Sequence, residues 1–294
     1  EGPLMDFGNA IEDAEGKDGK LVLSVNRKGK EIDVVIQLKA IGRFSDTYPY
    51  DCKKSVLLAK GATEYLTTST FINREQCHAK CMSGLALLAA GKIEEAKKVV
   101  YSWNTIPEFG IWVWPASYQS ILLSEYYLMT KDEKVLPTIQ GLVDVLERGQ
   151  VPDMADYKDR THGKMGNVGH KFRTGGFGHN TKVGGYGTMT ITTALAVTAF
   201  ELAKDCGAEV DQKKIDLALN YLRKSTTKEG YIGYHTHKGS YAAAGRQGIA
   251  IVAHKLAGDT QVNNDYIKLA SQGLSKSKKY LNDAHADSVL SVCW

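Results

Sequence analysis

The stretch "GGYGTMTITTALAVTAFELAKD", residues 184–205, shows best how this chain folds. Its glycine-rich start leads into a helix predicted over Thr188–Asp205, in which small and apolar residues lie on every side. A helix that is apolar all round is typical of a protein interior. The sequence therefore predicts a buried helix that begins directly after a glycine-rich loop.

The same two-helix pattern recurs along the chain. Small residues also fill "HAKCMSGLALLAAG" (78–91) and "SYAAAGRQGIAIVAHKLAGD" (240–259), and an amphipathic, charged segment such as "DQKKIDLALNYLRKS" (211–225) follows each small-residue helix. The offset from Thr193 to Arg246 is about one repeat. Repeats of about 20–50 residues indicate stacked helical arrays. Alternating inner and outer helices predict either a solenoid or a closed α/α toroid.

Glycine-rich loops with aromatic residues connect the predicted helix pairs, as in "GGFGHNTKVGGYG" (175–187) and "EGYIGYHTHKG" (229–239). A phosphate-binding loop needs a Lys directly after its last glycine and then Ser or Thr, and a dinucleotide loop follows a strand with G-x-G-x-x-G spacing. Neither pattern is present here. We therefore interpret these glycines as residues that permit tight turns.

The N-terminal region has a different pattern. Leu4, Phe7, Ile11 and Ala14 have helical spacing, and "LVLSVNRKGKEIDVVIQL" (21–38) alternates on both sides of a Lys28-Gly29 turn, which predicts a β-hairpin. We therefore predict a small α+β segment over residues 1–42 and an all-α domain over residues 43–294.

Two resemblances follow from these stretches. The helix and hairpin between Gly2 and Leu38 resemble the last third of a PDZ domain. The glycine-containing loop and strand with which PDZ domains grip a peptide carboxylate are not in this stretch, so we assign no peptide-binding residue, although a protein or peptide partner remains an expectation. The loop and helix of "GGYGTMTITTALAVTAFELA" resemble the α/α toroid of terpenoid cyclases and protein prenyltransferases.

Most of the chain is similar to a bacterial family, domain of unknown function 6288, in which a PDZ-like segment precedes such a toroid. The matching stretches are "GRFSDTYPYDCKKS" (42–55), "GIWVWPASYQSILLSEYYL" (110–128), "GGFGHNTKVGGYG" and "NDAHADSV" (282–289). The resemblance implies an α/α toroid of paired helices, preceded by a PDZ-like remnant and cut at its C-terminal end. A periplasmic or secreted full-length protein is one expectation, although the sequence does not decide the compartment.

Composition and motifs argue against several functions. The formal net charge of +4 is scattered among acidic residues rather than gathered in a basic stripe, so we expect no nucleic-acid partner. No apolar run approaches the roughly 20 residues of a membrane span. Five cysteines do not form a disulfide framework, and we interpret Cys77 and Cys81 as packed helix residues.

The known chemistries of such toroids also lack support in the sequence. The acidic motifs of terpene cyclisation are absent from the sequence. Asp205, Cys206 and His254 are the residues that a zinc prenyltransferase reading would need, but adjacent side chains at a helix end diverge. We predict no metal and no cofactor.

Loop histidines, aromatic residues and one arginine form the candidate ligand-binding set, because loops before inner helices gather at one end of a toroid. Imidazoles act as acids, bases or hydrogen-bonding groups near neutral pH. Arg246 lies among alanines and needs a counter-ion, for which Asp287 is a candidate. The set is Trp112, Trp114, His170, His179, Asn180, Tyr186, Tyr234, His235, His237, Arg246, His285 and Asp287.

Two functions agree with these features. The first is a toroid that binds a glycan, peptide or lipid in its cavity, and the residues do not decide whether a reaction follows. The second is a non-catalytic scaffold or protein-interaction module.

Overall fold

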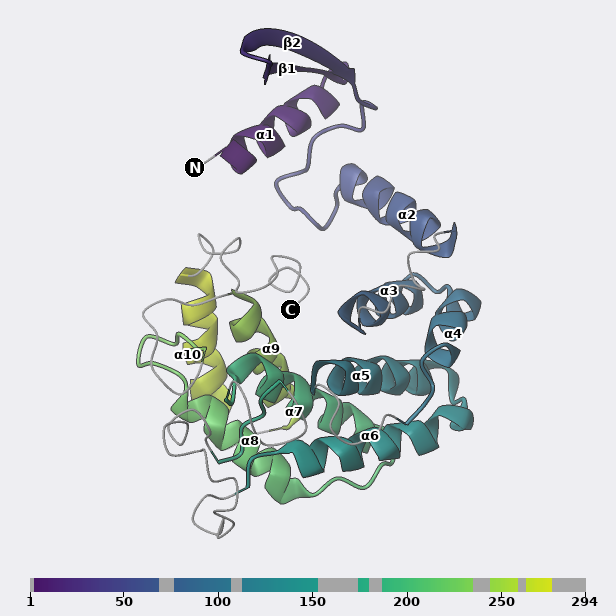
Figure 1. Cartoon of the computed structure of the whole chain (residues 1–294), viewed down its shortest axis with the longest axis vertical. Coiled ribbons are helices and arrows are strands. Elements are labelled where there is room, and N and C mark those ends of the chain that lie inside the picture. Colours follow the sequence, from purple (N-terminus) through teal and green to yellow (C-terminus); the bar gives the residue numbers. More distant parts are fainter. Residues whose placement is uncertain are drawn as a thin grey trace. The chain divides into compact units, whose positions relative to one another are not determined.

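The structure is a computed structural model that describes residues 3–68, 77–106, 113–152, 174–179, 187–234, 244–258 and 263–276. It is mostly helical, with one antiparallel hairpin near the N-terminus (Figure 1). The chain divides into two compact units, Glu1–Phe71 and Ile72–Trp294. Each unit is described by itself.

The first unit contains the predicted helix and hairpin. Its elements are α1 (Pro3–Glu15), β1 (Lys20–Arg27), β2 (Lys30–Gln37) and α2 (Lys53–Thr68). The strands pair antiparallel from Lys20 opposite Gln37 to Arg27 opposite Lys30, around the predicted turn. Lys28 and Gly29 both have positive φ, as a two-residue hairpin turn requires.

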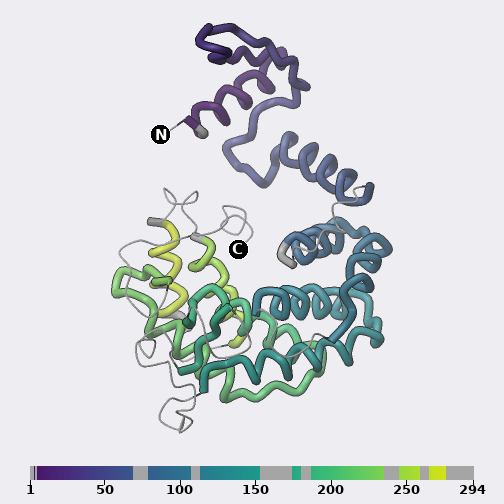
Figure 2. Tube along the Cα trace, viewed as in Figure 1, coloured from purple at the N-terminus to yellow at the C-terminus, as the bar shows by residue number. Residues whose placement is uncertain are grey.

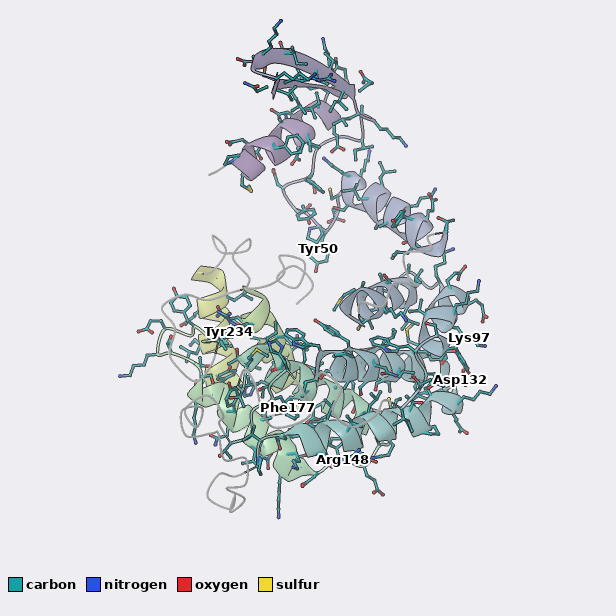
Figure 3. The ribbon with its side chains drawn as sticks, viewed as in Figure 1. Tyr50, Lys97, Asp132, Arg148, Phe177 and Tyr234 are labelled. Atoms are coloured by element: carbon teal, nitrogen blue, oxygen red, sulfur yellow. The ribbon has the colours of Figure 1, made fainter. Side chains whose placement is uncertain are left out.

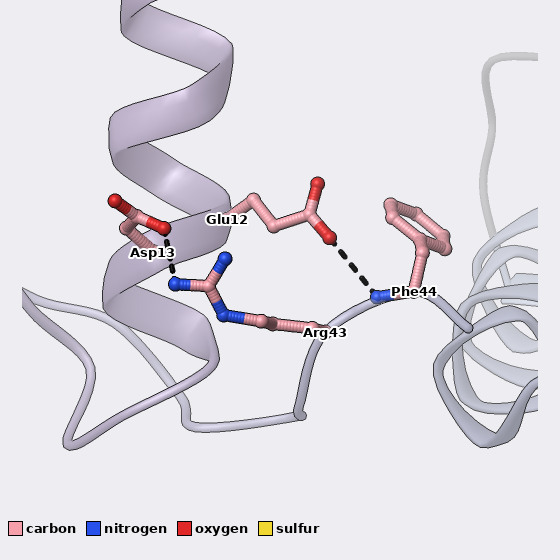
Figure 4. Close-up of polar contacts among 4 residues, drawn as sticks. All are labelled: Glu12, Asp13, Arg43 and Phe44. Carbon is pink, nitrogen blue, oxygen red and sulfur yellow. Dashed lines mark hydrogen bonds and ion pairs between the residues drawn. The ribbon is translucent and has the colours of Figure 1, made fainter. Parts of the chain in front are cut away.

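Polar contacts fix the segment after the hairpin to the end of α1 (Figure 4). Asp13 pairs with the guanidinium of Arg43, and the carboxylate of Glu12 accepts from the backbone N–H of Phe44 at 3.0 Å. Glu15 pairs at 2.7 Å with Lys54, which is 3% exposed. These contacts extend the first unit beyond residue 42, the limit of the predicted α+β segment.

The second unit consists of helices in pairs. Its elements are α3 (Cys77–Ala89), α4 (Ile93–Tyr101), α5 (Val113–Thr130), the short 3-10 helix η2 (Glu133–Val135), α6 (Leu136–Gly149), α7 (Thr190–Asp205), α8 (Gln212–Lys224), α9 (Ala244–Leu256) and α10 (Asn263–Lys276). Figure 2 follows the chain through them. The predicted helix over 188–205 is α7, and every residue from Thr190 to Ala203 is buried.

Four helices form an inner row. Helices α3, α5, α7 and α9 pack side by side in this order, and α4, α6, α8 and α10 each pack on the inner helix that precedes them (Figure 1). This arrangement agrees with the predicted alternation of inner and outer helices. The closure of the row into a ring stays a prediction.

The sequence places Asp132 and Asp211 directly before helical stretches and so predicts that they cap those helices, as the structure has it. The carboxylates of Asp132 and Asp211 accept from the backbone N–H groups of Lys134 and Lys213, as N-caps do. Helix α5 begins at Val113, so Trp114, which we expected in a loop, is helical. Pro115 can lie in this first turn because the N–H that it lacks would have no intrahelical partner there.

Candidate functional site

The loops before α7 and α9 each cap the inner helix that precedes them. The carbonyl of His179 accepts from the backbone N–H of Val113 at the start of α5, at 2.6 Å. One repeat later, the carbonyl of Tyr234 accepts from the N–H of Thr190 at the start of α7, at 3.1 Å. Since each loop residue bonds to the same point of the preceding helix, His179 and Tyr234 occupy equivalent positions.

The inner helices run parallel, so their first turns lie at one end of the row. Near the other end, the Cys206 thiol after α7 lies 3.5 Å from the carbonyl of Ser124 in α5. One end of the row therefore carries five residues that we call the aromatic–arginine cluster. They are Trp114, Tyr118, His179, Tyr234 and Arg246; Figure 3 labels Tyr234.

Trp114 and His179 form the first pair of this cluster. The indole Nε1–H of Trp114 donates to Nδ1 of His179 at 2.9 Å. The Tyr118 ring lies one turn further along α5, with its centroid 6.3 Å from that of Trp114. His179 thus contacts α5 through both its backbone and its side chain, which fixes the loop before α7 to that helix.

Tyr234 and Arg246 form the second pair. The guanidinium carbon of Arg246 lies 5.4 Å from the centroid of the Tyr234 ring, within the range of cation–π attraction. Arg246 is 5% exposed and lies in the first turn of α9. The prediction that Arg246 is a buried charge is confirmed.

The other predicted site residues lie outside the described part of the chain. They are Trp112, His170, Asn180, Tyr186, His235, His237, His285 and Asp287. The pairing of Arg246 with Asp287 therefore stays a prediction. The four predicted residues that are described, Trp114, His179, Tyr234 and Arg246, lie at the same end of the helix row.

The glycine-rich loop before α7 packs tightly against an outer helix. A Cβ atom on Gly175 would collide with the backbone carbonyl of Leu217 in α8, and one on Gly230, in the equivalent loop before α9, with that of Leu269 in α10. Both glycines have positive φ, near +85°. The interpretation that these glycines serve backbone geometry is supported at these two positions.

The residues of the zinc prenyltransferase reading do not converge. Asp205 is exposed, whereas Cys206 is buried at the same helix end. The ring of His254 packs on Tyr266 of α10 with 3.9 Å between centroids. No group of three metal-ligating side chains lies close together within the described residues.

Residues 53–294 match the model of a family described as Domain of unknown function (DUF6288). The chain belongs to the DUF6288 family. The match covers the whole aromatic–arginine cluster and every helix from α2 to α10. No curated protein matches this DUF6288 chain. Among the described residues, no helix is both long and apolar enough to cross a bilayer.

Two carboxyl groups of this DUF6288 domain, the half-buried Glu125 and the buried Glu201, were missed by sequence reasoning. Glu125 lies on the same face of α5 as Trp114 and Tyr118, because residues eleven apart nearly eclipse on a helix. Burial raises its pKa, and the carboxylate of Asp205 on α7 adds to the effect. Burial also raises the pKa of Glu201, whose Oε1 atom has no hydrogen-bond partner.

A signal for these carboxyl groups is present in the sequence. Glu125 is the one charged residue in the eighteen residues of α5, as Arg246 is among the alanines at the start of α9. The reasoning that selected Arg246 would also have selected Glu125.

Proposed function

We propose that the second unit is an α/α toroid that binds a glycan, peptide or lipid at the end of its inner helices. The aromatic–arginine cluster supports this proposal, because backbone bonds hold its two pairs at equivalent points of neighbouring repeats. Aromatic faces beside a few fixed polar groups are typical of ligand sites.

A fluorine-labelled protein tests this proposal. The chain has four tryptophans, so incorporated 5-fluorotryptophan gives few signals, and Trp114→Phe assigns that of Trp114. We expect one class among soluble oligosaccharides, peptides and lysolipids to shift the Trp114 signal and to raise the melting temperature. Tyr234→Leu should weaken this binding, whereas Tyr127→Leu, on α5 outside the cluster, should not. Ligands that stabilise the protein without shifting the Trp114 signal would place binding elsewhere.

The first unit favours a second candidate function, a protein-interaction module built on a PDZ-like remnant. Its apolar side chains are unusually exposed: Val35 is 56% exposed and Val56 is 68% exposed. Its described buried apolar residues are Ala14, Leu21 and Cys52. Exposed apolar patches of this kind often mark interaction surfaces.

A groove of about 430 Å³ lies within the first unit, between Phe44, Tyr48 and Pro49 on one side and the first turns of α2 on the other. Val56→Glu would introduce a charge into this groove. If the interaction function holds, this variant loses a partner that wild type captures by affinity purification, whereas ligand binding at Trp114 is unchanged. Loss of both activities in the variant would indicate general unfolding.

A further inference from the structure

We infer that β2 is an interface between two copies of this chain, whose hairpins join into one four-stranded antiparallel sheet across a twofold axis at Val35. This inference goes beyond both proposed functions, because it concerns neither the aromatic–arginine cluster nor the groove beside α2. It depends on the open edge of β2, on the pattern of its side chains and on its charges.

The outer edge of β2 has backbone groups that can pair with another strand. The sheet has two strands, and α1 packs mainly on β1 (Figure 1). Leu38 donates its backbone N–H to the carbonyl of Gly19, so every second residue of β2, counted back from Leu38, bonds towards β1. The residues between them direct their backbone groups away from β1; they are Glu31, Asp33, Val35 and Gln37. Within the described part of the chain, these outward groups have no backbone partner, and such edges pair readily with another chain.

Strand β2 also exposes apolar side chains on both faces of the sheet. Ile36 lies opposite the buried Leu21 in the hairpin and therefore shares its face, as do Val34 and Ile32. These three β2 side chains are 38–39% exposed, and Val35 on the other face is 56% exposed. An additional strand beside β2 would cover apolar surface on both faces.

Geometry limits how β2 can pair with its own copy. Residues with outward backbone groups must lie opposite one another, so a twofold axis passes through a residue of β2 and not between two residues. Among the four central positions, an axis at Asp33 sets two aspartates against each other. An axis at Val34 sets Val35 against Asp33 of the second copy, and an axis at Ile36 sets Val35 against Gln37. An axis at Val35 has none of these mismatches.

With the axis at Val35, the four strands form rows of similar side chains. On one face, Val22 and Val35 of both copies make a row of four valines, because Val22 lies opposite Val35 in the hairpin. On the other face, the two central rows are wholly apolar. Each of these rows consists of Leu21 and Ile36 from one copy and Val34 and Leu23 from the other. Cross-strand pairs of β-branched residues stabilise a sheet, so this register is favoured on both faces.

The same axis pairs opposite charges at both ends of the interface. Glu31 lies opposite Lys39 of the second copy, and the symmetry repeats this pair; both side chains are exposed in the single chain. Asp33 lies opposite the neutral Gln37. Charges on an edge strand oppose pairing with an unrelated strand, whereas here they find complementary partners. A second copy of the chain is therefore the partner that β2 fits.

Cysteine substitution at the axis tests the register. Val35 faces itself in the proposed pairing, and opposite residues of a bonded antiparallel pair have Cα atoms about 5.5 Å apart, within disulfide range. We expect Val35→Cys to form a disulfide-linked dimer under mild oxidation, in excess over wild type, whose own cysteines set the background. Val34→Cys is the matched control, because Val34 then lies opposite Ile36. More cross-linking in Val34→Cys than in Val35→Cys would overturn the inferred axis.

Sedimentation of the full chain at several concentrations tests the charges. We expect a monomer–dimer equilibrium whose dissociation constant rises at least about fivefold in Glu31→Lys and in Lys39→Glu, because each variant sets like charges opposite each other twice. Combining the two substitutions in one chain should restore the wild-type dimer. Lys28→Glu, in the hairpin turn, changes the net charge as Lys39→Glu does and should leave the dimer unchanged. If the combined variant dissociates like the single variants, the inferred pairing is wrong.

Val35→Lys should make the protein monomeric without changing its circular dichroism, because this side chain is exposed in the single chain. A wild type that sediments as a monomer even at submillimolar concentration would overturn the inference and leave the edge of β2 to another strand. A dimer that persists in Val35→Lys would also overturn it, because a different surface would then join the copies. Val56→Glu should not affect the dimer, so a failure here is distinguishable from a failure of either proposed function.

Discussion

At the scale of single residues, Asp132 joins three elements of the second unit. Its Oδ2 accepts from the hydroxyls of Tyr101 at 2.7 Å and Tyr126 at 3.1 Å, and Oδ1 caps η2 through Lys134. The hydrogen bond from Tyr101 lowers the pKa of Asp132. Burial, together with the hydrogen bond that Tyr126 donates to Asp132, raises the pKa of Tyr126 to about 12. Figure 3 labels Asp132.

Asp132→Ala should lower the free energy of unfolding by about 2–4 kcal/mol, because the variant loses a helix cap and leaves the buried Tyr126 hydroxyl without its partner. Urea denaturation at pH 7 measures this change. The difference should shrink below about pH 4, since a carboxylate with a lowered pKa stabilises the fold only while it is ionised. The neighbouring exposed substitution Glu133→Ala is the control, and an equal loss there would contradict the assignment.

Cys52 gives a second pH-dependent prediction. The Ser55 hydroxyl and the backbone N–H of Ser45 lower the pKa of this thiol from 9.0 to about 6. Between these values the unfolded chain binds more protons than the folded one, so the free energy of unfolding should rise with pH from about 6 to 9.

Urea denaturation of wild type and Cys52→Ser at pH 6, 7.5 and 9 tests this prediction. In Cys52→Ser, the free energy of unfolding should no longer rise between pH 6 and 9. Cys206→Ser should keep it, because burial raises the pKa of the Cys206 thiol instead of lowering it. An unchanged slope in Cys52→Ser would show that other groups cause the pH dependence.

Sequence reasoning succeeded for residues whose role is local. Asp132 and Asp211 precede helices and cap them, because a cap depends on only a few neighbouring positions. It missed Glu125, whose pKa is raised by burial and by the carboxylate of Asp205 at the end of α7, a helix far away in the sequence. The bond between Trp114 and His179 was also beyond sequence reasoning, since nothing local specifies that these two side chains meet.

At the scale of elements, glycines serve the loops in two ways: they permit a positive φ, and they allow the backbone to lie close to a neighbouring helix. Gly230 has positive φ and also lies against the carbonyl of Leu269, whereas Gly207 has the same φ with open space around it. Gly207→Ala should therefore lower the free energy of unfolding by about 1 kcal/mol, because only the backbone conformation is strained.

Gly230→Ala should cost at least about 3 kcal/mol, because its Cβ atom also forces the loop away from α10. Thermal denaturation of the two variants compares them under identical conditions. Similar melting temperatures would show that the loop moves away from α10 at little cost.

The boundaries of the helices were predicted to within a few residues where small-residue or amphipathic patterns were long. Helix α8 (Gln212–Lys224) fills almost the whole of the amphipathic stretch 211–225 that the sequence indicated. The error at the start of α5 has a local cause: Pro115 and two tryptophans suggested a loop, but a proline is tolerated in the first turn of a helix.

At the scale of the whole molecule, the two units differ in how they are stabilised. In the second, helix α7 is buried along almost its whole length. In the first unit, every residue of β2 is exposed, and ion pairs join the end of α1 to Arg43 and Lys54. A two-stranded hairpin is only marginally stable without a covering layer.

Hydrogen exchange followed by mass spectrometry should therefore show rapid exchange of the amides of β1 and β2 and slow exchange of those of α7. Raising the salt concentration should accelerate exchange in the segment that follows the hairpin, around Arg43, more than in α7, because the exposed ion pair between Asp13 and Arg43 is screened. Peptides from α8, an amphipathic outer helix of the second unit, are the internal reference. Equal protection of hairpin and α7 would contradict this difference in stability.

The sequence predicted the inner and outer helices, the hairpin and their order, all of which depend on patterns with a short period. It did not predict the contacts by which residues 43–54 join α1, because these depend on Glu12, Asp13 and Glu15, which look like ordinary surface residues.

The capping of each inner helix by the following loop also bears on how such a protein grows by duplication. The backbone N–H of Val113 is bonded to the carbonyl of His179, and that of Thr190 to the carbonyl of Tyr234. Deleting a helix pair together with the loop in front of it would therefore leave the start of the preceding inner helix uncapped. A gene segment that starts inside one glycine-rich loop and stops inside the next would carry a complete set of bonds. Insertions and deletions among related genes should therefore begin and end in these loops, out of phase with the helix pairs themselves.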